Sequence, residues 1–149
     1  MIIYLDICCF NRPFDDQADL LVRLQTEAKL HVQELIRGGT LSLVWSAIMD
    51  VENEANPDVN RKVAVGGWRS LAVVDVSING CVECIADELA QLGVKPMDAL
   101  HVACAIEAEA DYFLTTDKAL LRKMGSHQDL IVVDPVDFIR ALTEIKNED

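Results

Sequence analysis

The sequence predicts an α/β fold in which helices cover both faces of a mostly parallel sheet. Short apolar, β-rich runs alternate with longer stretches of helical periodicity along the chain. Their order is strand, helix, strand, two helices, strand, two helices, strand, helix, strand, helix, which is typical of parallel sheets. With 149 residues, 51% of them hydrophobic, the chain can bury one core. We therefore expect a single domain over residues 1–149.

Five short segments carry the strand signal. Each is rich in Val, Ile, Leu or aromatic side chains, and a polar turn or cap residue follows it. In chain order, the expected strands are Ile2–Leu5, Leu41–Trp45, Ala72–Val76, Tyr112–Thr115 and Leu130–Val133.

The expected helices are marked by their ends. Asp15 or Asp16 can cap a long helix with apolar residues at three-and-four spacing, and Gly38-Gly39 ends it. Ser46 can cap a helix that runs through Glu52. A further helix is expected from Pro57 to Gly66-Gly67, and another begins after Ser77 or Asn79 and ends at Leu92-Gly93. Pro96 begins the next helix, and Asp117 can cap the one after it. The last helix starts at Pro135, with Asp134 as its cap.

The charge and hydropathy of the chain exclude several classes of protein. A formal charge of -12 argues against an extended basic surface for nucleic acid. Two bound Mg²⁺ ions would still leave -12 + 4 = -8, so metal cannot account for all of the acidity. The apolar start, Met1–Leu5, is too short for a signal peptide, and no stretch approaches the roughly 20 apolar residues that span a bilayer. We expect a cytoplasmic protein without a membrane segment.

The five cysteines argue against a secreted disulfide scaffold, because their number is odd in a very apolar chain. Cys81 and Cys84 form a Cys-x-x-Cys motif, but no second Cys or His pair stands at zinc-site spacing. We therefore expect both to be small buried residues rather than metal ligands or a redox pair.

Four acidic residues fall where open parallel sheets bind ligands, beyond the carboxyl ends of the strands. Asp6 follows the first strand and Asp117 the fourth, whereas Glu52 and Asp98 stand near the starts of two helices at the same edge. Clustered carboxylates repel one another unless a cation neutralises them, and oxygen ligands suit Mg²⁺ or Mn²⁺. The sequence therefore predicts that Asp6, Glu52, Asp98 and Asp117 bind one or two such ions.

Each of these acids also has a purely structural interpretation. Asp6 can form an Asx turn, Asp98 can favour a helix N-terminus, and Asp117 can cap a helix. Glu52 has acidic neighbours, as a solvated helix face would. Four such coincidences at one edge would be unusual, and this favours the metal site.

Other polar residues are candidates for supporting roles. Ser46 and Thr116 could orient carboxylates or hold metal-bound water, although helix capping and local backbone bonding explain them equally well. Arg12, Arg61 and Lys118 are candidate phosphate contacts, with a solvated surface role as the alternative.

Two further residues are expected to be structural. His101 lies one turn beyond Asp98, and we expect a core or hydrogen-bonding histidine rather than a catalytic base. Trp45 ends a strand and is expected to pack in the core rather than stack on bases.

Four segments together resemble the PIN-domain superfamily. Its more specific motifs are the Asp-Ala-x-His-x-Ala helix at 98–103 and Thr-x-Asp-x-x-Leu at 115–120. The order and spacing match from about residue 2 to residue 138, which is nearly the whole chain. The four segments are Tyr4–Cys8, Ser46–Glu52, Met97–Ala103 and Phe113–Leu120.

The resemblance implies a three-layer α/β/α sandwich and a Mg²⁺- or Mn²⁺-dependent endoribonuclease acting on single-stranded RNA, with the same four acids at the metal site. It also implies a VapC-like toxin, paired with a small antitoxin protein and often a homodimer. The segments at 11–15 and 52–57 depart from the typical toxin and indicate an atypical subgroup. The acid carried over on the helix is Glu52, which shares a face with Ile48 and Ala55, whereas Glu54 points about 200° away.

Other functions remain open at this point. A PIN-like regulatory or RNA- or protein-binding domain with little or no nuclease activity would suit the acidic surface. A receiver domain would need paired acids after the first strand and a Lys after the fifth, and Ile7-Cys8-Cys9 and Leu130–Val133 supply neither. A haloacid-dehalogenase-type phosphatase would need a second Asp where Cys8 stands.

Overall fold

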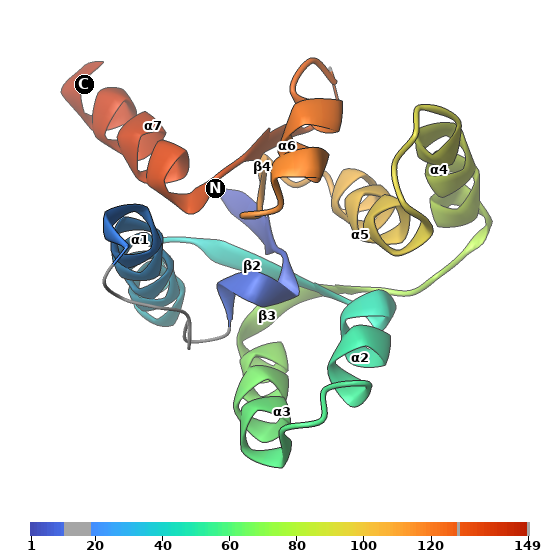
Figure 1. The fold of residues 1–149 in the computed structure, drawn as a ribbon, viewed down its shortest axis with the longest axis horizontal. Helices are drawn as coiled ribbons and strands as arrows, with labels where there is room; N and C mark the ends of the chain where they lie inside the picture. The colour runs from blue at the N-terminus through green and yellow to red at the C-terminus, as the bar shows by residue number, and fades with distance from the viewer. Residues whose placement is uncertain (11–18, 128, 149) are drawn as a thin grey trace.

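The sheet is entirely parallel in the part of the chain that the computed structural model describes, residues 1–10, 19–127 and 129–148 (Figure 1). Its strand order is β3-β2-β1-β4-β5, and each strand pairs in parallel with its neighbours. This confirms the predicted α/β class. The strands are β1 Ile2–Leu5, β2 Ser42–Ser46, β3 Ala72–Val76, β4 Tyr112–Leu114 and β5 Ile131–Val133.

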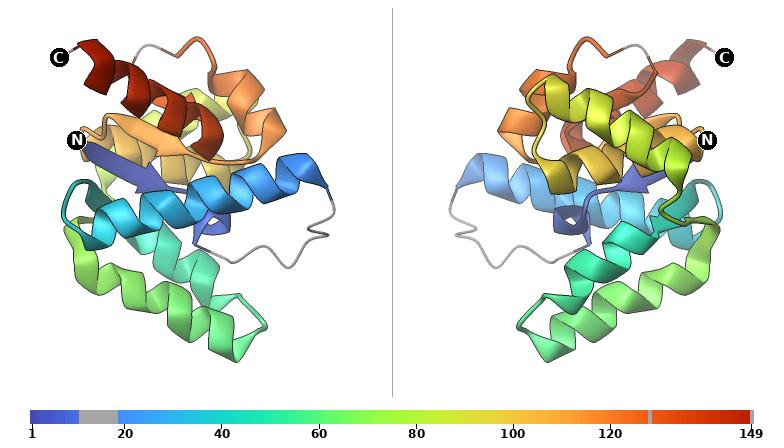
Figure 2. Two further views of the ribbon diagram at one scale, coloured as in Figure 1. Left: turned by 90° about the vertical axis from the view of Figure 1, so that its left-hand side faces the viewer. Right: turned by 90° about the vertical axis from the view of Figure 1, so that its right-hand side faces the viewer.

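Helices cover both faces of the sheet and complete the three-layer sandwich. Helices α1 and α7 pack together on one side, and α4 and α5 pack together on the other (Figure 1). Seen from the side, α1 lies between α7 and α3 (Figure 2). The helices are α1 Leu20–Arg37, α2 Ala47–Glu54, α3 Val59–Gly66, α4 Gly80–Gln91, α5 Pro96–Glu107, α6 Lys118–Met124 and α7 Pro135–Glu148, with short 3-10 helices η1 Ile7–Cys9 and η2 Gly67–Leu71.

The direction of strand addition reverses beside β1. From β1 the chain builds outward through β2 to β3, then crosses back to add β4 and β5 on the other side. Open parallel sheets bind ligands at such a switch point, outside the carboxyl ends of the two central strands, here β1 and β4. The residues that follow these two strands, Asp6 and Thr115, are therefore placed at this edge by topology alone.

Helix ends follow local chemistry, with one correction. Ser46 caps α2 through a hydrogen bond from the Met49 backbone N–H to its hydroxyl, as predicted. The cap of α1 is Asp19, whose carboxylate accepts from the backbone of Leu21 and Val22; Asp15 and Asp16, expected in that role, lie outside the described residues. After α1, Gly39 adopts a φ of +80°, which only glycine reaches without steric cost.

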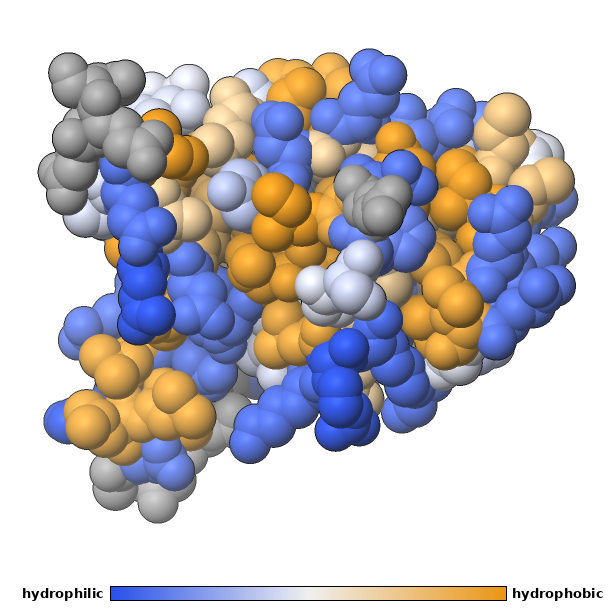
Figure 3. All heavy atoms as spheres, turned by 90° about the horizontal axis from the view of Figure 1, so that it is seen from above, coloured by the Kyte–Doolittle hydropathy of each residue, from blue (hydrophilic) through white to orange (hydrophobic). Residues whose placement is uncertain are grey.

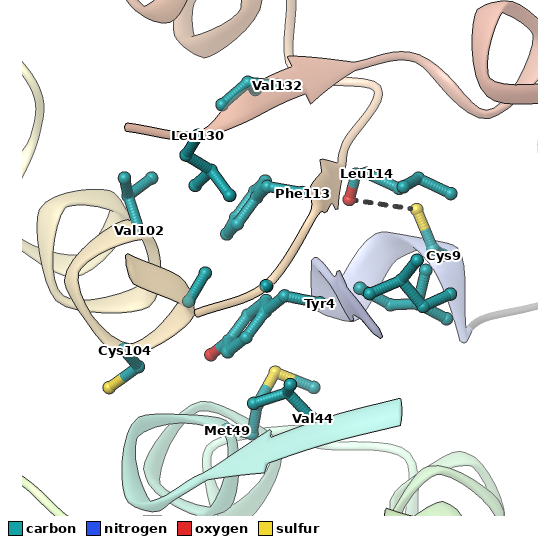
Figure 4. Close-up of a cluster of buried hydrophobic side chains, with 14 of the residues drawn as sticks. Tyr4, Cys9, Val44, Met49, Val102, Cys104, Phe113, Leu114, Leu130 and Val132 are labelled. Carbon is teal, nitrogen blue, oxygen red and sulfur yellow. Dashed lines mark hydrogen bonds between the residues drawn. The ribbon is translucent and has the colours of Figure 1, made fainter. Parts of the chain in front are cut away.

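Buried side chains from every layer meet around β1 and β4. Tyr4 lies within this core, with Phe113 on one side and Met49 on the other (Figure 4). The Tyr4 and Phe113 rings are stacked, with centroids 5.1 Å apart and planes 8° from parallel. Trp45 is fully buried, as predicted, and its indole N–H donates to Asp50.

The surface mixes apolar and hydrophilic side chains, as the view from above shows (Figure 3). Its most exposed large apolar residues include Val59 and Val63 on α3 and Leu20 on α1. No helix in the described ranges combines the length and apolar character that crossing a bilayer requires.

Candidate functional site

Asp6 lies at the junction of the two central strands. Its backbone N–H donates to the Leu114 carbonyl at 2.9 Å, which extends the pairing of β1 with β4 by one step. Its carboxylate accepts a 2.7 Å hydrogen bond from the Thr115 hydroxyl. Burial raises the pKa of Asp6 above its usual value, against the lowering effect of Thr115 and His101, and the charge of Glu52 raises it further.

Asp117 reaches the same edge as the N-cap of α6. Its Oδ1 accepts from the backbone N–H groups of Ala119 and Leu120 at 2.9 and 3.2 Å. Its own backbone N–H donates to the Thr115 hydroxyl at 3.1 Å. The Thr115 hydroxyl therefore links Asp6 to Asp117. Thr115 is buried, and the sequence analysis did not identify it as a site residue. Its neighbour Thr116, predicted for such a role, donates to the Cys8 sulfur at 3.4 Å instead.

The two glutamates of α2 point in different directions. Oε2 of Glu52 lies 2.8 Å from Nε2 of His101, a buried side chain of α5. The Glu54 side chain is 72% exposed and pairs with Lys62 at 2.7 Å. The structure thus brings Glu52, and not Glu54, toward the edge that carries Asp6.

The pKa of Asp98 depends on the charges of the other three acids. It stands in the first turn of α5 and is half-buried. Burial is the largest cause that raises its pKa, and the charges of Asp6, Asp117 and Glu52 each raise it as well. The predicted acids thus share one electrostatic neighbourhood, although they come from four separate segments of the chain.

Behind Glu52 lies a buried chain of polar side chains. The Tyr4 hydroxyl is 2.6 Å from Nδ1 of His101 and 2.7 Å from the Ser46 hydroxyl. Ser46 and Tyr4 are fully buried and His101 is 1% exposed, so His101 is the hydrogen-bonding core residue that the sequence predicted. The signal that could have identified Tyr4 is its hydroxyl, which is a polar group in an otherwise apolar strand.

The candidate phosphate contacts are dispersed. Lys118 is exposed and directly follows Asp117 at the start of α6. Arg61 on α3 lines a 590 Å³ pocket with Arg37 and Trp68, and none of the four acids lines this pocket. Arg12 lies outside the described residues.

The Cys-x-x-Cys motif is a second correction. Cys81 and Cys84 are both exposed on α4, not buried, because the buried face of that helix is formed by Val82, Ala86 and Leu89. All five cysteines of the chain are free thiols.

The donor set fits a hard divalent cation in its chemistry. It consists of carboxylates, and the oxygens Oε1 of Glu52 and Oδ2 of Asp117 accept no hydrogen bond from a described residue. In residues 1–10, 19–127 and 129–148, however, no three His, Cys, Asp or Glu side chains already stand close enough to share an ion.

Asp98→Asn is expected to raise the melting temperature of the metal-free protein at neutral pH. A pKa raised in the folded state means that the fold favours the protonated carboxyl group, so the stability that this group contributes at low pH is lost as the pH rises through that pKa. Thermal melting in EDTA measures this change. Adding Mn²⁺ should raise the wild-type melting temperature more than that of the variant. Asp87→Asn, an exposed change on α4, should alter neither value; a lower melting temperature for Asp98→Asn in EDTA would contradict the repulsion.

Comparisons with known proteins identify the fold. Neither protein-family models nor curated proteins match the sequence. One match is a chain in the crystal structure of VapBC2 from Rickettsia felis bound to a promoter DNA fragment. The match has a TM-score of 0.55 and 14% sequence identity, and it covers 89% of this chain and 97% of that one. A chain of VapBC-1 from nontypeable Haemophilus influenzae matches with a TM-score of 0.52 and 15% identity, over 91% and 98%. The chain therefore shares its fold with these VapBC chains, and this is the α/β/α fold that its resemblance to the PIN-domain superfamily implies.

Proposed function

We propose that this protein is a Mg²⁺- or Mn²⁺-dependent endoribonuclease that cuts single-stranded RNA. The observation that supports it most is the placement of the acids within reach of one another: the charges of Asp6, Asp117 and Glu52 all raise the pKa of Asp98. A cation would relieve this repulsion, and catalytic use of such a site is an established solution for phosphodiester hydrolysis.

In this proposal, Asp6, Glu52, Asp98 and Asp117 hold one or two ions. A bound ion supplies Lewis acidity, which lowers the pKa of water and neutralises charge on the phosphate. Thr115 orients Asp6 through their 2.7 Å hydrogen bond, and the α6 backbone orients Asp117. Lys118, which is exposed and follows Asp117 at the start of α6, is the candidate to contact an RNA phosphate.

The experiment that tests the proposal is cleavage of a mixed-sequence single-stranded RNA by the purified protein. We expect cutting with Mn²⁺ and none with EDTA, and slower cutting of the same sequence as a duplex. Cleavage that persists in EDTA would contradict a metal-dependent site.

A partner protein belongs to the same proposal. The matched structures are VapBC complexes by their names, and we propose that this chain likewise acts in the cytoplasm as a toxin with a small antitoxin and as a homodimer. Exposed leucines on α1, Leu20, Leu21 and Leu24, offer apolar surface that a partner would cover. Light scattering on the purified chain tests the homodimer directly.

A second candidate is a regulatory or binding domain with the PIN-like fold and little or no nuclease activity. Two observations favour it: the net charge of -12, and the absence of a preformed three-ligand group in the described ranges. Protein that binds Mn²⁺ yet leaves a broad set of RNAs intact would support this candidate over the nuclease.

Glu52→Gln and Glu54→Gln make a matched pair on one helix. We expect Glu52→Gln to weaken Mn²⁺ binding by about tenfold or more, because it replaces a ligand carboxylate. Glu54→Gln should leave Mn²⁺ binding within about twofold, since an exposed ion pair contributes little. Isothermal titration calorimetry measures both. Equal losses for the two variants would show that the acids act only through overall charge.

A further inference from the structure

We propose that Ser46, Tyr4 and His101 form a directional hydrogen-bond chain that positions Glu52 for cation binding. The inference rests on the proposed function and names three positioning residues for it. None of the three is an acid, and none is expected to touch the ion.

The chain links four elements of the fold. Ser46 ends β2, Tyr4 lies in β1, His101 belongs to α5 and Glu52 to α2. Consecutive polar atoms lie 2.7, 2.6 and 2.8 Å apart, and the first three residues are at most 1% exposed. Buried polar groups at such distances are hydrogen-bonded, because leaving one without a partner is costly.

The direction of each hydrogen bond follows from the last acceptor. A carboxylate only accepts, so Nε2 of His101 carries the proton that it donates to Glu52. In a neutral ring Nδ1 is then the acceptor, and the Tyr4 hydroxyl donates to it. The Tyr4 oxygen accepts from the Ser46 hydroxyl, whose oxygen in turn accepts from the Met49 backbone N–H.

This arrangement fixes one oxygen of Glu52 and leaves the other for a cation. Oε2 is bound by His101, whereas Oε1 accepts from no described residue. A glutamate otherwise samples several side-chain conformations, and holding it in one removes an entropic cost from ion binding. Thr115 does the same for Asp6 with a single hydroxyl.

Tyr4 therefore acts on Glu52 through the tautomer of His101. Glu52 and the Tyr4 hydroxyl both favour the ring with its proton on Nε2, and without the hydroxyl only Glu52 does so. The other neutral tautomer would turn a lone pair toward the Glu52 carboxylate and repel it. The Tyr4→Phe change consequently alters how Glu52 is held, although Glu52 is two hydrogen bonds away. The aromatic ring that stacks on Phe113 is retained.

Mn²⁺ affinity, measured by calorimetry on the full chain, tests the proposal. Tyr4→Phe should weaken binding by about tenfold or more, the range seen when groups that orient metal ligands are removed. Tyr112→Phe removes the hydroxyl of the other tyrosine and should leave affinity unchanged. Far-UV circular dichroism establishes that each variant is folded.

Substitutions of His101 give a second arm that does not depend on Tyr4. His101→Gln retains an N–H donor toward Glu52 and should stay within about threefold of wild type, whereas His101→Leu should lose about tenfold or more. Adding Tyr4→Phe to His101→Gln should cost little further affinity, because the glutamine donor needs no tautomer selection.

Nitrogen-15 NMR of the imidazole supplies the spectroscopic readout, with His101→Gln assigning the signal among the three histidines. We expect the proton on Nε2 in wild type and a larger share of the ring protonated on Nδ1 in Tyr4→Phe, because only Glu52 then favours the Nε2 proton. A wild-type ring protonated on Nδ1, alone or together with Nε2, would overturn the chain. Equal Mn²⁺ affinity of wild type and Tyr4→Phe would overturn its positioning role and leave the metal site standing. No Mn²⁺ binding by wild type would overturn both.

Discussion

Asp6→Asn is expected to reduce Mn²⁺-dependent RNA cleavage by at least about 100-fold. Losing groups that only orient metal ligands already costs about 10–100-fold, and this change removes a carboxylate itself. The variant should stay folded, because asparagine has nearly the same shape and its side-chain oxygen can still accept from Thr115. Initial cleavage rates at saturating Mn²⁺ measure the effect.

Its matched control is Asp137→Asn, the same chemical change at an exposed position on α7. We expect wild-type rates for this control. Unchanged cleavage by Asp6→Asn would show that other residues, or a contaminating nuclease, do the cutting.

Phe113→Ala is expected to lower the free energy of unfolding by about 3–5 kcal/mol. Phe113 is fully buried in β4 and stacks on Tyr4, so its removal leaves a cavity at the centre of the core. With domain stabilities of about 5–15 kcal/mol, a loss of this size would leave much of the variant unfolded at moderate temperature. Urea denaturation measures it.

The comparison for this variant is Val73→Ala in the edge strand β3. Val73 is 60% exposed, and we expect its loss to change the unfolding free energy by no more than about 0.5 kcal/mol. Equal effects of the two changes would mean that the Tyr4–Phe113 stack is not the packing centre that its burial indicates.

Local patterns predicted the elements because local chemistry forms them. Ser46 precedes α2 and Pro96 begins α5 as expected, since a cap or a first-turn proline acts on the residues beside it. Strand ends were less accurate: β2 runs from Ser42 to Ser46, one residue later than predicted. This register depends on pairing with β1 and β3, which no local signal encodes.

Burial was harder to predict than secondary structure. Cys81 and Cys84 have side chains that suit a core, yet they lie on the exposed face of α4. The rotation of α4 about its axis is set by Val82, Ala86 and Leu89, which pack inward. A residue type states only a preference for burial, whereas the larger apolar face of its helix decides the outcome.

By itself, the sequence determined the α/β class, the order of the elements and the placement of four acids near one edge of the sheet. These depend on periodicity and on the rule that parallel strands present their carboxyl ends at one edge. The sequence also favoured Glu52 over Glu54, and the contacts of the two side chains agree with that choice. The tertiary structure alone decided that Thr115 and not Thr116 holds Asp6, and that Tyr4 reaches Glu52 through His101. Such contacts join residues up to 109 positions apart, and their geometry arises only when the core packs.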